Sequence, residues 1–175
     1  RYIAVTGVQT CALPIWLSKD LKLNLTYLNM VYDKDIMENE GAPKYGKVYT
    51  NTAIADLTYK LGNGHAIRLE GQHMWQRQDS ALHQPDNFNG NWAMFLVEYT
   101  ISPNWFFSFF DEYNYGNKYE DRQIHYLNAS FAYLTGTTRF SLGYGRQRGG
   151  IVCVGGVCKP VPASNGIYLS VTSSF

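Results

Sequence analysis

The sequence predicts an all-β fold, an antiparallel up-and-down transmembrane β-barrel meander of about eight strands. Three observations predict this fold. Apolar and polar side chains alternate along most of the chain, as they do in strands with one face in lipid and the other in water. Tight turns and long loops alternate between these segments. Aromatic residues make up 15% of the chain and gather near both ends of the segments.

Eight extended segments account for the strand number. They reach or exceed the roughly 9 to 11 residues that a tilted strand needs to cross a bilayer. In the fifth segment Asp111 falls on the same face as Trp105 and Phe107, and we expect a β-bulge to resolve this conflict. The segments span residues 17–33, 47–61, 65–78, 91–102, 104–115, 123–134, 138–147 and 166–175.

The alternation assigns the side chains to two faces. A mixed-charge inner face either lines a wet pore or satisfies itself through ion pairs. The apolar side chains expected to face outward are Leu57, Leu69, Val97, Phe131, Leu142 and Leu169. The polar side chains expected to line the lumen are Asp56, Lys60, Arg68, Glu70, Glu98, Asn128 and Arg139.

The connections predict the orientation of the barrel. Short turns at residues 62–64, 102–104 and 135–137 contain the Gly, Pro and Asn that tight turns favour. Short periplasmic turns and long extracellular loops are typical of outer-membrane barrels. A soluble lipocalin-like barrel, with its apolar face inward, is the alternative. The long links cover residues 34–46, 79–90, 116–122 and 148–165.

The last ten residues alternate and end on phenylalanine. Ile167, Leu169, Val171 and Phe175 share one face. This ending resembles the C-terminal signal strand that outer-membrane β-barrels present to the barrel assembly machinery. The resemblance implies the outer membrane of a Gram-negative bacterium, with membrane lipid and the assembly machinery as partners.

The last long link contains the most specific local pattern. Gly155 and Gly156 suit a two-residue hairpin turn, which would place Cys153 opposite Cys158 at a non-hydrogen-bonded pair. Cα atoms there approach to about 4.5 Å, so a cross-strand disulfide can close. We rank a disulfide above its two alternatives, a zinc site and free thiols, because no further metal ligands lie nearby.

This stretch, Cys-Val-Gly-Gly-Val-Cys followed by Val-Pro-Ala-Ser-Asn-Gly and the Ser-Ser-Phe ending, resembles a family of Bacteroidota outer-membrane barrels of unknown function. The resemblance implies that the chain is the C-terminal portion of a larger barrel. It brings no catalytic residues with it.

The beginning of the chain differs in character. Residues 5–15 resemble a translated sequencing adapter, so we expect residues 1–15 to be a non-native segment and residues 16–175 to be the barrel portion. On this interpretation Cys11 is not a native cysteine and residues 1–15 pack poorly. The alternative is a natural β-strand.

Composition and motifs narrow the function. The chain carries 15 basic and 14 acidic residues, which argues against a nucleic-acid partner. The four histidines have no metal-ligand spacing, and we expect no enzyme activity, metal or cofactor. The leading hypothesis is a porin-like channel for small solutes. The alternative is a non-conducting surface-binding or scaffold barrel that meets an extracellular ligand through its loops, especially residues 79–90 and the cysteine ribbon; a lipid enzyme ranks third.

Overall fold

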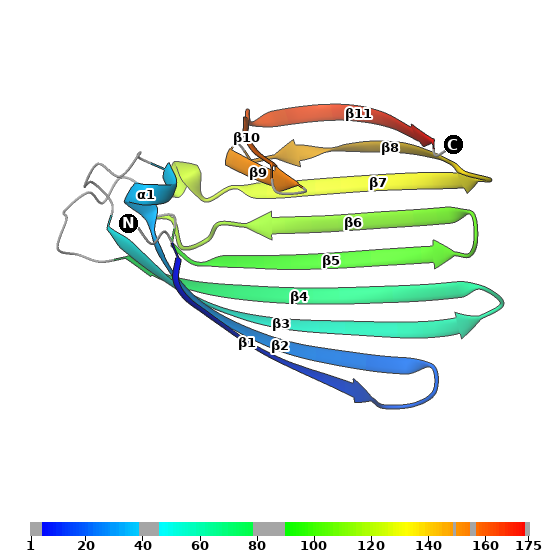
Figure 1. Ribbon diagram of the computed structural model, residues 1–175. Coiled ribbons are helices and arrows are strands. Elements are labelled where there is room, and N and C mark those ends of the chain that lie inside the picture. The colour runs from blue at the N-terminus through cyan, green and yellow to red at the C-terminus, as the bar shows by residue number, and fades with distance from the viewer. Residues whose placement is uncertain (1–4, 39–45, 79–89, 149, 155–156, 174–175) are drawn as a thin grey trace.

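The structure is a computed structural model that describes residues 5–38, 46–78, 90–148, 150–154 and 157–173. Within these ranges nine antiparallel strands form one meander, and two more strands form a separate ribbon (Figure 1). The strands of the main sheet are β1 (Val5–Trp16), β2 (Leu21–Asp33), β3 (Lys47–Gly62), β4 (His65–Gln78), β5 (Trp92–Ile101), β6 (Trp105–Tyr113), β7 (His125–Thr135), β8 (Thr138–Gln147) and β11 (Ser164–Ser173). The ribbon consists of β9 (Gly150–Val154) and β10 (Val157–Val161).

Helical structure in the described residues is limited to α1 (Lys34–Glu38) and the 3-10 helix η3 (Glu120–Arg122). Asp33 caps the N-terminus of α1, because its Oδ1 accepts hydrogen bonds from the backbone N–H groups of Asp35 and Ile36. The described part of the chain contains no helix with the length and apolar character needed to cross a membrane.

The predicted antiparallel β-meander is confirmed. Alternation and turn chemistry define the strands so well that the bounds of β4 and β8 coincide with the predicted segments. The β3–β4 turn shows how turn residues fix the ends of two strands. Gly62, Asn63 and Gly64 have φ values of 89°, 51° and 82°, a left-handed conformation that glycine and asparagine adopt most readily.

The predicted loop polarity is also visible. The β3–β4, β5–β6 and β7–β8 turns lie at one end of the sheet, whereas α1 and the β9–β10 ribbon lie at the other (Figure 1). The last strand, β11, runs toward the short-turn end. Short and long connections are therefore separated, as the sequence predicted.

The N-terminal strand corrects one expectation. β1 pairs with β2 in continuous register from Gly7 to Trp16, so the expected poor packing of residues 1–15 is wrong for the part described. Backbone hydrogen bonds need no particular sequence, and Leu13 also lies opposite Leu25 on the apolar face. Pro14 is tolerated because β1 is an edge strand. The main sheet thus has nine strands instead of about eight.

A second correction concerns the expected bulge near Asp111. β6 pairs with both β5 and β7 in unbroken register, and Asp111 stays on the apolar face opposite Phe95 and Leu127. Its Oδ2 lies 2.6 Å from Nδ1 of His125. One oxygen of the carboxylate therefore pairs with a side chain on the neighbouring strand without a change in register, whereas Oδ1 is buried and has no hydrogen-bond partner among the described residues.

The sheet has an exposed apolar face and a more protected polar face. Only Val48, Trp92 and Ala132 are buried hydrophobic residues in the described part of the chain. On β11, Ile167 and Leu169 are 77% and 73% exposed. Large exposed apolar residues follow the predicted outward face across the sheet, among them Leu25, Phe95, Phe109, Leu127, Phe131, Leu142 and Val171. No sealed apolar core covers this face in the described residues.

Candidate functional site

The polar face is the candidate functional site. Figure 1 shows that the sheet is curved. Side chains from strands that are not neighbours meet on the polar face. The rings of Trp92 on β5 and Tyr126 on β7 stack with their centroids 6.0 Å apart. The guanidinium of Arg148, just beyond β8, lies 4.7 Å from the centroid of the Trp92 ring. Such contacts across intervening strands identify this face as the concave one.

Arg68 organises the centre of the concave face. Its Nε lies 2.5 Å from Oδ2 of Asp56, and its Nη1 lies 2.7 Å from Oε2 of Glu98. Its Nη2 pairs with Oε2 of Glu70. One guanidinium therefore contacts three carboxylates, drawn from β3, β4 and β5, using the fork of donors that arginine provides.

The sheet register explains this cluster. Asp56 lies directly opposite Glu70, and like charges in that position destabilise a sheet. Arg68 compensates, because it precedes Glu70 by two residues on the same face and lies opposite Glu98. Gln72 donates a hydrogen bond to Glu70, which is 8% exposed. Three carboxylates against one guanidinium leave an excess of negative charge at this position.

Four of the predicted lumen residues thus meet in one cluster, and three do not. Lys60 is exposed near the short-turn end and does not take part in the cluster. The guanidinium of Arg139 lies 5.5 Å from the centroid of the Phe106 ring. Asn128 accepts a hydrogen bond from the Tyr168 hydroxyl at 3.0 Å.

A polar hollow of about 470 Å³ lies between the Arg68 cluster and Arg139. Its lining includes Glu98 and Arg139 themselves. Between them the lining presents the hydroxyl groups of Thr100, Ser108, Ser130, Ser141 and Ser170. The concave face is therefore hydrogen-bonding as well as charged, which suits contact with water and polar solutes.

The exposed apolar face carries two aromatic groups, one near each end of the strands. Near the short turns, the rings of Trp105 and Tyr133 have centroids 4.6 Å apart, and Nδ1 of His65 lies 2.6 Å from the Tyr99 hydroxyl. Near the long loops, the ring of Tyr113 stacks on His125 with centroids 3.9 Å apart. The predicted clustering of aromatic residues at both ends is confirmed, although Trp92 lies on the concave face.

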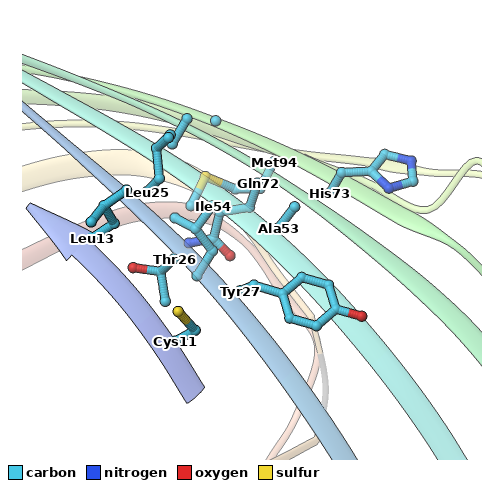
Figure 2. A pocket seen from close by; sticks show the side chains of 12 residues that line it. Cys11, Leu13, Leu25, Thr26, Tyr27, Ala53, Ile54, Gln72, His73 and Met94 are labelled. Carbon is cyan, nitrogen blue, oxygen red and sulfur yellow. The ribbon is translucent and has the colours of Figure 1, made fainter. Parts of the chain in front are cut away.

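Figure 2 shows a hollow of about 590 Å³ lined by residues of β1 to β5. Most of its lining lies on the apolar face. Ala53, Ala55 and Gly71 are too small to fill the space between Leu25 and His73. The lining contains no Asp, Glu, Lys or Arg side chain, so apart from the Cys11 thiol and the His73 imidazole the hollow offers mainly apolar surface.

The predicted disulfide and assembly signal are resolved only in part. In the ribbon, Cys153 lies opposite Cys158 in the backbone register, as predicted. Their side chains fall outside the described part, so the disulfide stays a prediction. Ile167, Leu169 and Val171 do share the exposed face of β11, whereas Phe175 lies outside the described residues. Most of the loop at 79–90 also lies outside them.

Sequence reasoning missed a second cluster on the concave face, formed by Trp92, Tyr126, Arg146 and Arg148. The one local hint was the alternation Gly143-Tyr-Gly145, which leaves two positions on the concave side of β8 without side chains but does not identify the rings and guanidiniums that meet there. In the described residues, no group of three or more His, Cys, Asp or Glu side chains is placed to hold a metal ion.

The fold and site together define a class, an antiparallel β-meander with an exposed apolar face and a charged concave face. The chain belongs to a family of unknown function, DUF6029, whose match covers residues 12–175. No curated protein matches the chain.

Proposed function

We propose that this chain forms the wall of an outer-membrane β-barrel whose concave face lines a water-filled passage for small solutes. The observation that carries the proposal is the inversion of polarity. Large apolar side chains lie exposed on one face of the sheet, while charged side chains gather on the concave face. A soluble barrel would place these groups the other way round, whereas a membrane barrel needs this arrangement.

The aromatic groups support the same orientation. Rings with one polar end favour the headgroup level of a membrane. Here Tyr99, Trp105 and Tyr133 mark one level, and Trp75 and Tyr113 mark the other. On this proposal the apolar face contacts membrane lipid, and the exposed row on β11 is read by the barrel assembly machinery of a Gram-negative bacterium.

A passage requires charged groups that water and ions can reach. The side chains of Arg68 and Glu98 are 38% and 39% exposed, so the cluster is accessible from the concave side. Its excess negative charge favours cations over anions. Two unit charges about 7 Å apart in water interact by about 0.6 kcal/mol, which corresponds to a roughly threefold change in local ion concentration.

Planar-bilayer recordings of the full-length protein test the proposal. We expect stepwise conductance, and we expect Glu98→Gln to lower the cation preference measured from the reversal potential in a salt gradient. Glu120→Gln is the matched control, because Glu120 lies in the exposed η3 segment outside the sheet and the chemical change is the same. A folded, membrane-inserted protein that never conducts would overturn the channel and favour the surface-binding alternative.

A further inference from the structure

Two arginines near the long-loop end of the concave face each lie over an aromatic ring. The guanidinium of Arg148 lies 4.7 Å from the centroid of Trp92, and that of Arg146 lies 5.5 Å from the centroid of Tyr126. The two rings stack on each other at an interplanar angle of 29°. Trp92 is 8% exposed, so the aromatic support is anchored in the sheet. Cation–π contacts of this kind fix a guanidinium without neutralising it.

Within the described residues, neither Arg146 nor Arg148 forms an ion pair or a side-chain hydrogen bond. This contrasts with Arg68, whose three guanidinium nitrogens each contact a carboxylate. A guanidinium that contacts a ring keeps five N–H donors, and their planar fork matches a carboxylate or a phosphate.

A pocket of about 460 Å³ lies beside these arginines. Phe110 and Tyr126 supply apolar surface, and Asn128 and Tyr168 supply hydrogen-bonding groups. Gly143 and Gly145 leave room for the Tyr168 and Asn128 side chains that line the pocket, since a Cβ at either glycine would overlap one of them. The volume is within the range of small-molecule sites and is large enough for a monosaccharide.

The charges limit the ligand further. Glu112 is the one carboxylate in the lining, beside Arg146 and Arg148. Two guanidiniums and one carboxylate leave one net positive charge, which favours a ligand with a single anionic group. The Glu112 carboxylate can accept hydrogen bonds from hydroxyl groups of the same ligand.

We propose that this pocket binds a monosaccharide-sized solute that carries one anionic group together with hydroxyl groups. Arg146 and Arg148 bind the anionic group of the solute, while Glu112 and Asn128 contact its hydroxyl groups. The inference rests on the proposed function only in that the concave face is open to water. It adds a selective site at the long-loop end, ahead of the cation-favouring Arg68 cluster.

Calorimetric titration of the detergent-solubilised full-length protein provides the test, with D-glucuronate and D-glucose as probes. We expect glucuronate to bind at least tenfold more tightly than glucose. Arg146→Gln and Arg148→Gln should each weaken glucuronate binding about tenfold, as expected for loss of a charge-assisted hydrogen bond. Circular dichroism confirms that each variant keeps its β-structure.

Arg77→Gln is the matched control. Arg77 also lies over a ring, 5.2 Å from the centroid of Tyr49, but it is outside the pocket. We expect this variant to bind glucuronate as the wild type does. Equal affinity of the wild type for the two sugars, or unchanged binding in both pocket variants, would overturn the inference.

The two proposals fail separately. Glucuronate binding by a protein that never conducts would leave this site standing and remove the channel. Conductance without glucuronate binding would do the reverse.

Discussion

Replacing a single exposed leucine with arginine tests whether the apolar face meets lipid or water. Leu142 is 38% exposed and lies four residues beyond the start of β8. With a rise of about 3.4 Å per residue and a tilt near 45°, this places it roughly 10 Å from the short-turn edge. The apolar band of an outer-membrane barrel is about 25 Å tall, so Leu142 lies near its middle.

We expect Leu142→Arg to lower the free energy of unfolding by about 2–4 kcal/mol, the cost of arginine at the midplane. This corresponds to a roughly 30- to 900-fold shift in the folding equilibrium. Leu61→Arg is the control, because Leu61 is 52% exposed and lies next to the turn at Gly62. There the cost falls to about 0–1 kcal/mol.

The assay is equilibrium unfolding by urea from lipid vesicles, followed by tryptophan fluorescence. If both leucines faced water, both substitutions would change stability by no more than about 0.5 kcal/mol. Small and equal effects would therefore refute the membrane orientation. A large effect at Leu142 alone is the depth dependence that lipid imposes and water does not.

Two further predictions concern packing and the ribbon. Gly143→Ala should destabilise the protein by about 1–3 kcal/mol in the same assay, because its Cβ would overlap the Tyr168 ring. Gly166→Ala is the control: no atom lies within 4 Å of its Cβ position, so its stability should stay within about 0.5 kcal/mol of the wild type. Cys153 and Cys158 should resist thiol labelling until a reductant is added, whereas the exposed Cys11 should react at once; labelling of all three without reductant would contradict the disulfide.

Local sequence determined most of the strands because their signals are local. Alternation gives the face of each side chain, and turn residues give the ends, as at Gly62 and Gly64. The errors arose where a partner on another strand decides the outcome. Asp111 looked misplaced on an apolar face until pairing of β6 with β7 brought His125 beside it. The β1 segment looked unable to pack, yet the backbone of β2 accepts it.

The same distinction between local and long-range signals applies to the candidate site. The sequence placed Asp56, Arg68, Glu70 and Glu98 on one face, and hairpin register then brought them into contact. The aromatic–arginine cluster could not be found in this way. Arg148 lies beyond the end of β8 and reaches Trp92 on β5 because the sheet is curved. Curvature is a property of the whole sheet, so no short segment reports it.

The two edges of the sheet place the strongest demand on the membrane proposal. In the described residues β1 pairs only with β2, and β11 pairs only with β8. In water, an open edge is tolerated if it resists aggregation. In hydrocarbon, each unpaired backbone N–H or C=O costs several kcal/mol, so a row of them along β11 is not viable. A lipid-spanning form of this sheet must therefore pair both edges, with each other or with further strands, whereas a water-exposed form need not. Amide hydrogen exchange along β11 in the membrane-inserted protein tests this requirement. We expect the amides on both sides of β11 to be protected, because both edges are then paired. Rapid exchange along the edge that faces away from β8 would contradict the lipid-spanning form.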